Sequence, residues 1–310
     1  AKMPLMRKGD EHFQLVDHAP FCQRWPGLAT AGLPQGPGAL TSSCMKLRIP
    51  FTKKPPLVPV IRLQGAIGVG GRFGGGLNDA ALAGLIDKAF ALKPVAVALA
   101  INSPGGSPVQ SSLIAARIRR LAAEKGVKVH AFVEDVAASG GYWLACAGDD
   151  IWVDDSSIVG SIGVISAGFG FADFIARHGI ERRVVTAGRS KSLADPFQPA
   201  KPEDEARLRA LQDPIHKAFI AHVQARRGAR LDATADLFNA DIWVGQQAVE
   251  LGLADGVAHL VPKLKSLYGD KVRLLPMGQK RGLLARLTGR AMAGAWAEVE
   301  DRAAFARFGL

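Results

Sequence analysis

Short apolar runs that alternate with amphipathic segments constrain the fold of this chain most strongly. From Val60 onwards, the runs are separated by segments of about ten to fifteen residues whose apolar positions have helical spacing. Residues 95–101 form a nearly continuous apolar run, which is typical of a strand covered on both faces. Repeated β-α-β units of this kind predict an α/β fold in which helices pack outside a parallel sheet.

Proline content and charge divide the chain into three predicted regions. Residues 1–58 contain eight prolines and little periodicity, so we expect a flexible, basic leader. Residues 59–260 carry the strand and helix pattern and are expected to fold as one domain. Residues 261–310 combine arginines with large apolar side chains, which predicts a basic amphipathic extension that either lies on a membrane surface or docks on the domain.

The net charge of +11 lies entirely in the two end regions. Residues 1–58 carry eight Lys and Arg against three Asp and Glu, residues 261–310 carry ten against four, and residues 59–260 carry 21 of each. A nucleic-acid-binding fold would show its basic surface on the folded domain itself, so we expect no nucleic-acid partner. Basic ends favour peripheral contact with an anionic membrane, with solvated tails as the alternative.

No stretch reaches the roughly 18 to 20 apolar residues of a membrane-spanning helix, and we find no secretory signal at the N-terminus. The three cysteines form no C-x-x-C pair. We therefore expect a cytoplasmic protein, either soluble or peripheral at the inner membrane.

The glycine-rich loop at residues 70–76 lacks the P-loop lysine and the Rossmann spacing, and no ligand spacing predicts a metal site. We expect neither a cofactor nor a metal.

Ser139 is the first candidate for a catalytic residue. It lies where a predicted strand ends and a short helix of small residues begins, so a substrate could approach closely and the helix N-terminus would supply free N–H groups. A second strand end carries the sequence NSPGG at residues 102–106, whose glycines can present bare backbone N–H groups. Each feature alone is weak, and the alternative for Ser139 is a simple helix cap.

Four segments in order strengthen this interpretation. They are NSPGG at residues 102–106, ASGGY at 138–142, GSIGVI at 160–165 and GRSKSLADPF at 188–197. Together they resemble the signal peptide peptidase A or protease IV family (SppA, SohB-like) of Ser-Lys dyad serine peptidases, whose fold is akin to that of the Clp protease subunit and crotonase. The resemblance makes residues 59–260 the expected peptidase domain.

The resemblance implies a role for five residues. Ser139 would be the nucleophile, Lys191 the general base and Ser161 the residue that orients the lysine amine. The backbone N–H groups of Gly106 and Gly140 would form the oxyanion hole. A free lysine has a pKa of about 10.4, so a lysine base must lie among apolar groups. We therefore expect no carboxylate, such as that of Asp195, within ion-pair reach of Lys191.

By the same resemblance, the protein would be a serine endopeptidase that forms an acyl-enzyme with extended apolar peptides, such as signal-peptide remnants or membrane-derived peptides. Family members assemble into rings that complete the site, which predicts a homo-oligomer. Two other functions stay open at this point: a crotonase-like acyl-CoA enzyme, which would need no nucleophile, and an inactive peptide-binding scaffold. A Ser-His-Asp site is disfavoured because none of the seven histidines lies in a recognisable motif.

Overall fold

The computed structural model describes residues 54–68, 76–188, 190–278 and 302–310. Residues 1–53 and 279–301 lie outside the described residues, and with them most of the predicted leader and a large part of the predicted C-terminal extension. Most of the glycine-rich loop, residues 69–75, lies outside them as well. The division into three regions therefore stays a prediction.

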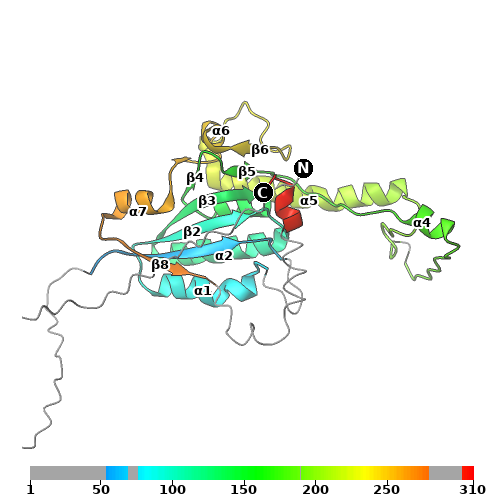
Figure 1. Cartoon of the computed structure of the whole chain (residues 1–310), viewed down its shortest axis with the longest axis horizontal. Coiled ribbons are helices and arrows are strands. Elements are labelled where there is room, and N and C mark those ends of the chain that lie inside the picture. The colour runs from blue at the N-terminus through cyan, green and yellow to red at the C-terminus, as the bar shows by residue number, and fades with distance from the viewer. Residues whose placement is uncertain (1–53, 69–75, 189, 279–301) are drawn as a thin grey trace, which may run out of the picture. The chain divides into compact units, whose positions relative to one another are not determined.

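A mainly parallel sheet forms the centre of the described region (Figure 1). Its strands are β1 (Leu57–Gln64), β2 (Ala96–Ser103), β3 (Lys128–Ala138), β4 (Asp150–Val153), β5 (Ile158–Gly160), β6 (Ile242–Val244), β7 (Gly256–Val257) and β8 (Arg273–Met277). The strands follow the order β6-β5-β3-β2-β1-β8, and β4 pairs with β3 and β7. Of these pairings only β5 with β6 is antiparallel. The predicted α/β fold is confirmed.

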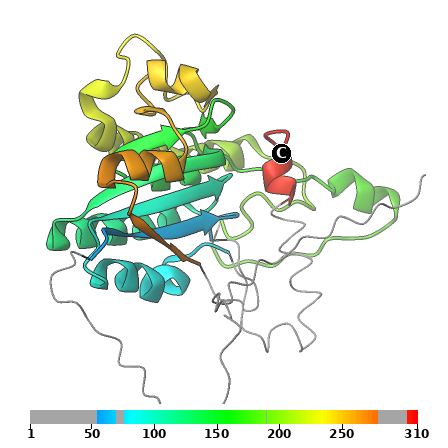
Figure 2. The same cartoon turned by 60° about the vertical axis from the view of Figure 1, so that its left-hand side comes forward.

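Helices cover both faces of the sheet. They are α1 (Asp79–Ala91), α2 (Pro108–Lys125), α3 (Gly140–Ala145), α4 (Ala172–Arg177), α5 (Pro202–Arg227), α6 (Gly245–Glu250) and α7 (Leu260–Tyr268), with the 3₁₀ turn η1 (Gly228–Arg230). Figures 1 and 2 show α1 and α2 on one face and α7 on the other. None of the described helices has the length and apolar character needed to cross a membrane.

Strand β2 lies at the middle of the sheet, and all eight of its residues are buried, as its apolar run predicts. Its side chains alternate between two cores. Leu99 and Ile101 pack with α1 and α2, whereas Ala98 packs with Phe132 and with Leu264 of α7. The period of two along a strand therefore divides one apolar run between both layers of helices.

Local signals in the sequence define several helix ends. The Asn78 side chain accepts a hydrogen bond of 2.9 Å from the Ala81 nitrogen at the start of α1. Gly126, with φ 62°, ends α2 in the left-handed conformation. A proline inside a helix usually kinks or breaks it, but α5 continues through Pro214. Pro214 is exposed, so water can bind the carbonyl group that loses its partner.

Residues 163–201 form a segment that we call the arm. Figure 1 shows its helix α4 extending away from the sheet, and none of the described residues of the arm is buried. Residues 183–185, Arg-Val-Val, have the composition of a strand but form none, since no described strand lies beside them. The exposed large apolar side chains of the arm are Ile165, Phe169, Phe171, Phe174, Ile180, Val184, Val185 and Phe197.

Candidate active site

The chain turns sharply where β3 ends and α3 begins, and Ser139 is the residue at that corner. Its backbone has φ 50° and ψ −121°. Residues other than glycine rarely adopt such a positive φ, and the strain costs about 1 to 3 kcal/mol. Ser139 occupies the N-cap position of α3, yet its side chain makes no capping hydrogen bond. A simple capping role is therefore excluded, and the half-buried Ser139 is left for other chemistry.

Two backbone amides lie together beside this corner. A methyl group on Gly105, in the turn after β2, would lie 2.9 Å from both the Ser139 Cβ and the Gly140 nitrogen. A methyl group on Gly140 would lie 3.4 Å from the Gly106 nitrogen. Within the described residues, neither the Gly106 nor the Gly140 nitrogen donates a hydrogen bond to the protein. Two unpaired N–H groups this close together can donate to one oxyanion.

Glycine is required at position 106 by its surroundings. Its φ is 141°, a conformation that L-residues rarely adopt, and a side chain there would overlap the backbone of Ile67. The Ile67 nitrogen donates to the Gly105 oxygen (2.8 Å), and the Ser107 nitrogen donates to the Ile67 oxygen (2.8 Å). The loop after β1 thereby fixes the turn after β2 and leaves the Gly106 N–H unpaired and exposed.

The segment that carries Ser161 adjoins the same corner. The Ser139 nitrogen donates to the Gly160 oxygen at 2.8 Å, so the residue before Ser161 is bonded directly to the corner. Ser161 also has a positive φ of 51°, and its nitrogen donates to the Asp241 oxygen at 2.7 Å. The structure therefore brings Ser139, Gly106, Gly140 and Ser161 to one end of the sheet, where β2, β3 and β5 finish.

Lys191 is not part of this group. It lies in a turn of the arm, and its side chain is exposed. Its backbone nitrogen donates to the Gly188 carbonyl oxygen at 3.2 Å. In the part of the chain that the structure describes, Lys191 forms no hydrogen bond with Ser139 or Ser161 and no ion pair. Asp195, the carboxylate that could have paired with it, is instead bound by Arg182 at 3.2 Å.

No described histidine substitutes for the lysine. His130 is buried and lies between Asp150 (2.8 Å) and the Tyr268 hydroxyl (2.7 Å), so both of its ring nitrogens have a partner in the core. His216 contacts the Ile162 carbonyl oxygen at 2.9 Å. His222 stacks on Trp143, and its burial lowers the pKa of the imidazole. None of these rings bonds to Ser139, so a Ser-His-Asp site is absent from the described residues.

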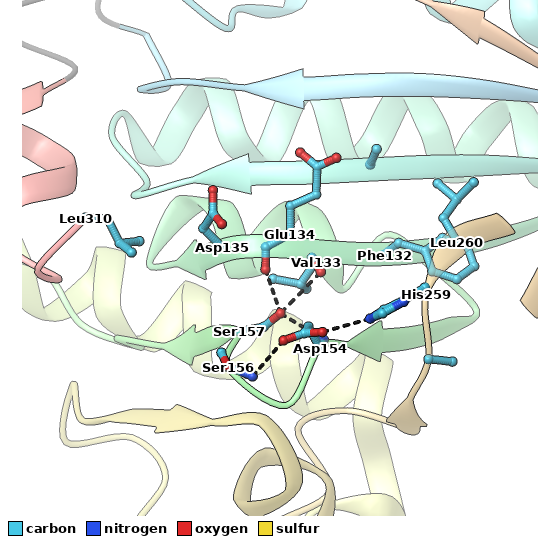
Figure 3. Close-up of a pocket in the computed structure, with 12 residues that line it drawn as sticks. Phe132, Val133, Glu134, Asp135, Asp154, Ser156, Ser157, His259, Leu260 and Leu310 are labelled. Carbon is cyan, nitrogen blue, oxygen red and sulfur yellow. Dashed lines mark hydrogen bonds and ion pairs between the residues drawn. The ribbon is translucent and has the colours of Figure 1, made fainter. Parts of the chain in front are cut away.

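The sequence interpretation missed one polar group near this site. Asn102 and Asp135 join the ends of β2 and β3 by a hydrogen bond of 2.5 Å. Asp135 and its neighbour Glu134 also line a cavity of about 420 Å³ (Figure 3), which includes none of the five predicted site residues. The available signal was the place of Asn102, directly before the glycine turn. No described group of three His, Cys, Asp or Glu residues could hold a metal ion.

A serine on a strained corner, beside two unpaired amides, forms an arrangement suited to acyl transfer. Comparison with known proteins identifies the family to which the chain belongs. The model of peptidase family S49 matches residues 122–267. A putative protease of Synechocystis sp. is 32% identical over 200 residues, which cover 63% of this chain and 72% of that protein. The chain therefore belongs to peptidase family S49.

Two further comparisons add detail. A protein of Brucella melitensis named Na(+)/H(+) antiporter NhaA is 50% identical over 271 residues, or 82% of this chain and 37% of that protein. This chain thus spans little more than a third of that relative's length. The solved structure of a mutant 1510-N membrane-bound stomatin-specific protease with a substrate peptide has a TM-score of 0.48 at 16% identity. The similarity covers 75% of this chain and 96% of that one.

Proposed function

We propose that this peptidase is a Ser-Lys endopeptidase in which Ser139 is the nucleophile and Lys191 the general base. The observation that carries the proposal is the strained backbone of Ser139 beside the unpaired amides of Gly106 and Gly140. A φ of 50° at a serine is retained only where the surroundings impose it, and catalytic corners are a common reason. Family membership makes peptide hydrolysis the chemistry to expect there.

In the proposed mechanism, the uncharged Lys191 amine accepts the Ser139 hydroxyl proton as Oγ attacks the scissile carbonyl carbon. The Gly106 and Gly140 N–H groups donate to the resulting oxyanion. The lysine then gives its proton to the leaving amine, and an acyl-enzyme forms. Water, deprotonated by the same amine, attacks the ester carbonyl carbon. The bond between that carbon and Ser139 Oγ breaks, the lysine returns the proton to Oγ, and the acid and the free serine are released. The Ser161 hydroxyl would hold the lysine amine in line.

This mechanism requires Lys191 to move close to a Ser139, and homo-oligomer assembly is the proposed means. Lys191 lies on the arm, whose apolar side chains are exposed in the single chain, with Val185 fully so at 101%. Such a surface favours burial against another protein. Docking of the arm on a second copy would cover these side chains and give a lysine the apolar surroundings that a base needs.

The proposed substrate is an extended apolar peptide, of the kind left by signal-peptide or membrane-protein cleavage. Residues 164–170 belong to no strand or helix and follow Ser161 closely in sequence, so their backbone groups are available for main-chain hydrogen bonds to an added peptide. We further propose a cytoplasmic location with peripheral contact between the basic ends and an anionic membrane, and no nucleic-acid partner. Residues 1–53 and 279–301 of these ends lie outside the described residues.

Two substitutions test the proposed mechanism. Ser139→Ala and Lys191→Met should each lower kcat on an apolar fluorogenic peptide by at least about 1000-fold, because both are needed for acylation. A crotonase-like enzyme would keep its activity in Ser139→Ala, and an inactive scaffold would show no turnover in the unmodified protein. Lys201→Met is the matched control, since Lys201 is another exposed lysine, at the start of α5. Its kcat should not change.

A further inference from the structure

Strand β3 carries an irregularity just before Ser139. Up to Val133 it pairs in register with β2, Ile101 opposite Val133, but the next pair is Ser103 with Ala137. Two steps along β2 therefore match four along β3, so β3 accommodates two extra residues. Below this bulge β3 pairs with β4, and above it with β5. The bulge thus redirects the strand that ends at Ser139.

Three contacts hold the bulge, and they come from three different strands or turns. The Ser157 hydroxyl donates to the carbonyl oxygens of Glu134 (2.5 Å) and Val133 (3.3 Å), as the dashed lines in Figure 3 show. The Glu134 carboxylate binds Arg62 of β1 in a bidentate ion pair of 2.8 and 2.9 Å. In the third contact, Asn102 Nδ2 of β2 donates to the Asp135 carboxylate at 2.5 Å. This hydrogen bond is shorter than those between Arg62 and Glu134.

Asn102 is the buried member of the third contact, and one of its side-chain atoms has no partner among the described residues. It is only 8% exposed, and its Oδ1 is buried without a hydrogen-bond partner among the described residues. A buried unpaired oxygen costs about 1 to 3 kcal/mol, so an amide that fills this place for stability alone is a poor solution. Asn102 also lies only four residues before Gly106, and Asp135 lies four residues before Ser139. Their hydrogen bond therefore joins β2 to β3 four residues before the glycine turn and the serine corner, which meet at the site.

We propose that Asn102 and Asp135 are positioning residues that fix the distance between the Ser139 hydroxyl and the Gly106 N–H. The inference rests on the proposed roles of Ser139 and Gly106. The charged hydrogen bond ties the end of β2 to the bulge of β3, so that the glycine turn and the serine corner move as one unit. Without it, the bulge can relax along β3 and displace Ser139 from the amides. A displacement of about 1 Å at a catalytic group can cost on the order of 100-fold in rate.

The experiment uses Asp135→Ala as its main variant, because Asp135 is exposed and its loss leaves no cavity. We expect kcat to fall about 10- to 100-fold with KM changed less than threefold, since the segment proposed to bind the peptide, which follows Ser161, is unchanged. Asn102→Ala should show the same pattern. The swapped double variant Asn102→Asp/Asp135→Asn keeps one donor and one acceptor, and it should recover kcat to within about threefold of the unmodified protein.

The matched control is Glu134→Gln, which weakens the ion pair between Arg62 and the same bulge but leaves the link to β2 intact. Its kcat should not change. The proposal is overturned if Asp135→Ala keeps its kcat within twofold, if Glu134→Gln loses as much as Asp135→Ala, or if the swapped variant is no better than Asp135→Ala. Labelling of the unmodified protein by a fluorophosphonate separates the two proposals. If Ser139 is not labelled, the proposed function fails, whereas labelling with an unaffected Asp135→Ala overturns only the positioning role.

Discussion

Substitution of Gly105 by alanine is the sharpest steric test of the site. The added Cβ would lie 2.9 Å from three atoms at once: the Ser139 Cβ, the Gly140 nitrogen and the Ala138 carbonyl oxygen. Non-bonded heavy atoms in favourable contact are about 3.5 to 4.0 Å apart. The glycine turn and the serine corner must therefore separate by roughly 0.6 to 1 Å. All three atoms belong to backbone or to the corner itself, so no flexible side chain can absorb this shift.

We expect Gly105→Ala to lower kcat by about 100-fold, which corresponds to about 2.7 kcal/mol in the activation free energy. Gly105 also has φ 103°, so alanine adds backbone strain, and overpacking adds about 1 to 3 kcal/mol to the loss of folding stability. The assay is kcat and KM on an apolar fluorogenic peptide, with urea unfolding in parallel to show that the variant is folded.

Gly126→Ala is the matched control for this prediction. Gly126 also has a positive φ, 62°, but a methyl group there would meet no atom within 4 Å. It should lose stability through backbone strain without any loss of kcat. The proposed need for close contact between the glycine turn and the serine corner is wrong if folded Gly105→Ala keeps its kcat within threefold, or if Gly126→Ala loses as much activity as Gly105→Ala.

Two other predictions concern the arm and helix α5. Phe174 is 57% exposed on α4. Phe174→Glu should yield a folded monomer by light scattering, and this monomer should show no peptide turnover. An active monomer would contradict the role proposed for assembly. Burial lowers the pKa of His222, so its neutral form stabilises the fold fully above the ordinary pKa of about 6.5, and this contribution is lost as the pH falls towards the lowered folded value. Urea unfolding of His222→Gln should show a smaller loss of stability over that range, and an unchanged pH profile would contradict it.

Much of the fold could be predicted from local patterns. The apolar run of β2, the cap at Asn78 and the left-handed Gly126 each act within a few residues, so the sequence contains the whole signal. The position of Ser139 at a strand-to-helix corner follows from the same patterns. By contrast, the bulge before it depends on pairing with strands far away in the chain, and nothing in the flanking residues Val133 and Val136 marks it.

The arm shows a different limit of sequence reasoning. Val184 and Val185 are residues that favour strands, yet they form none, because a strand needs a partner and none of the described strands lies beside them. The same holds for Lys191, whose proposed role depends on groups that a single chain does not bring to it. Local sequence therefore identifies the chemical groups of this site better than it identifies their spatial arrangement.

Covalent labelling of the intact protein by a peptidyl fluorophosphonate, followed by mass spectrometry, tests the central proposal most directly. The proposed Ser-Lys mechanism predicts one modified residue, Ser139, and at least a hundredfold slower labelling in Lys191→Met, because the lysine must remove the hydroxyl proton. Labelling at a different serine, or labelling of Lys191→Met at the rate of the unmodified protein, would contradict it.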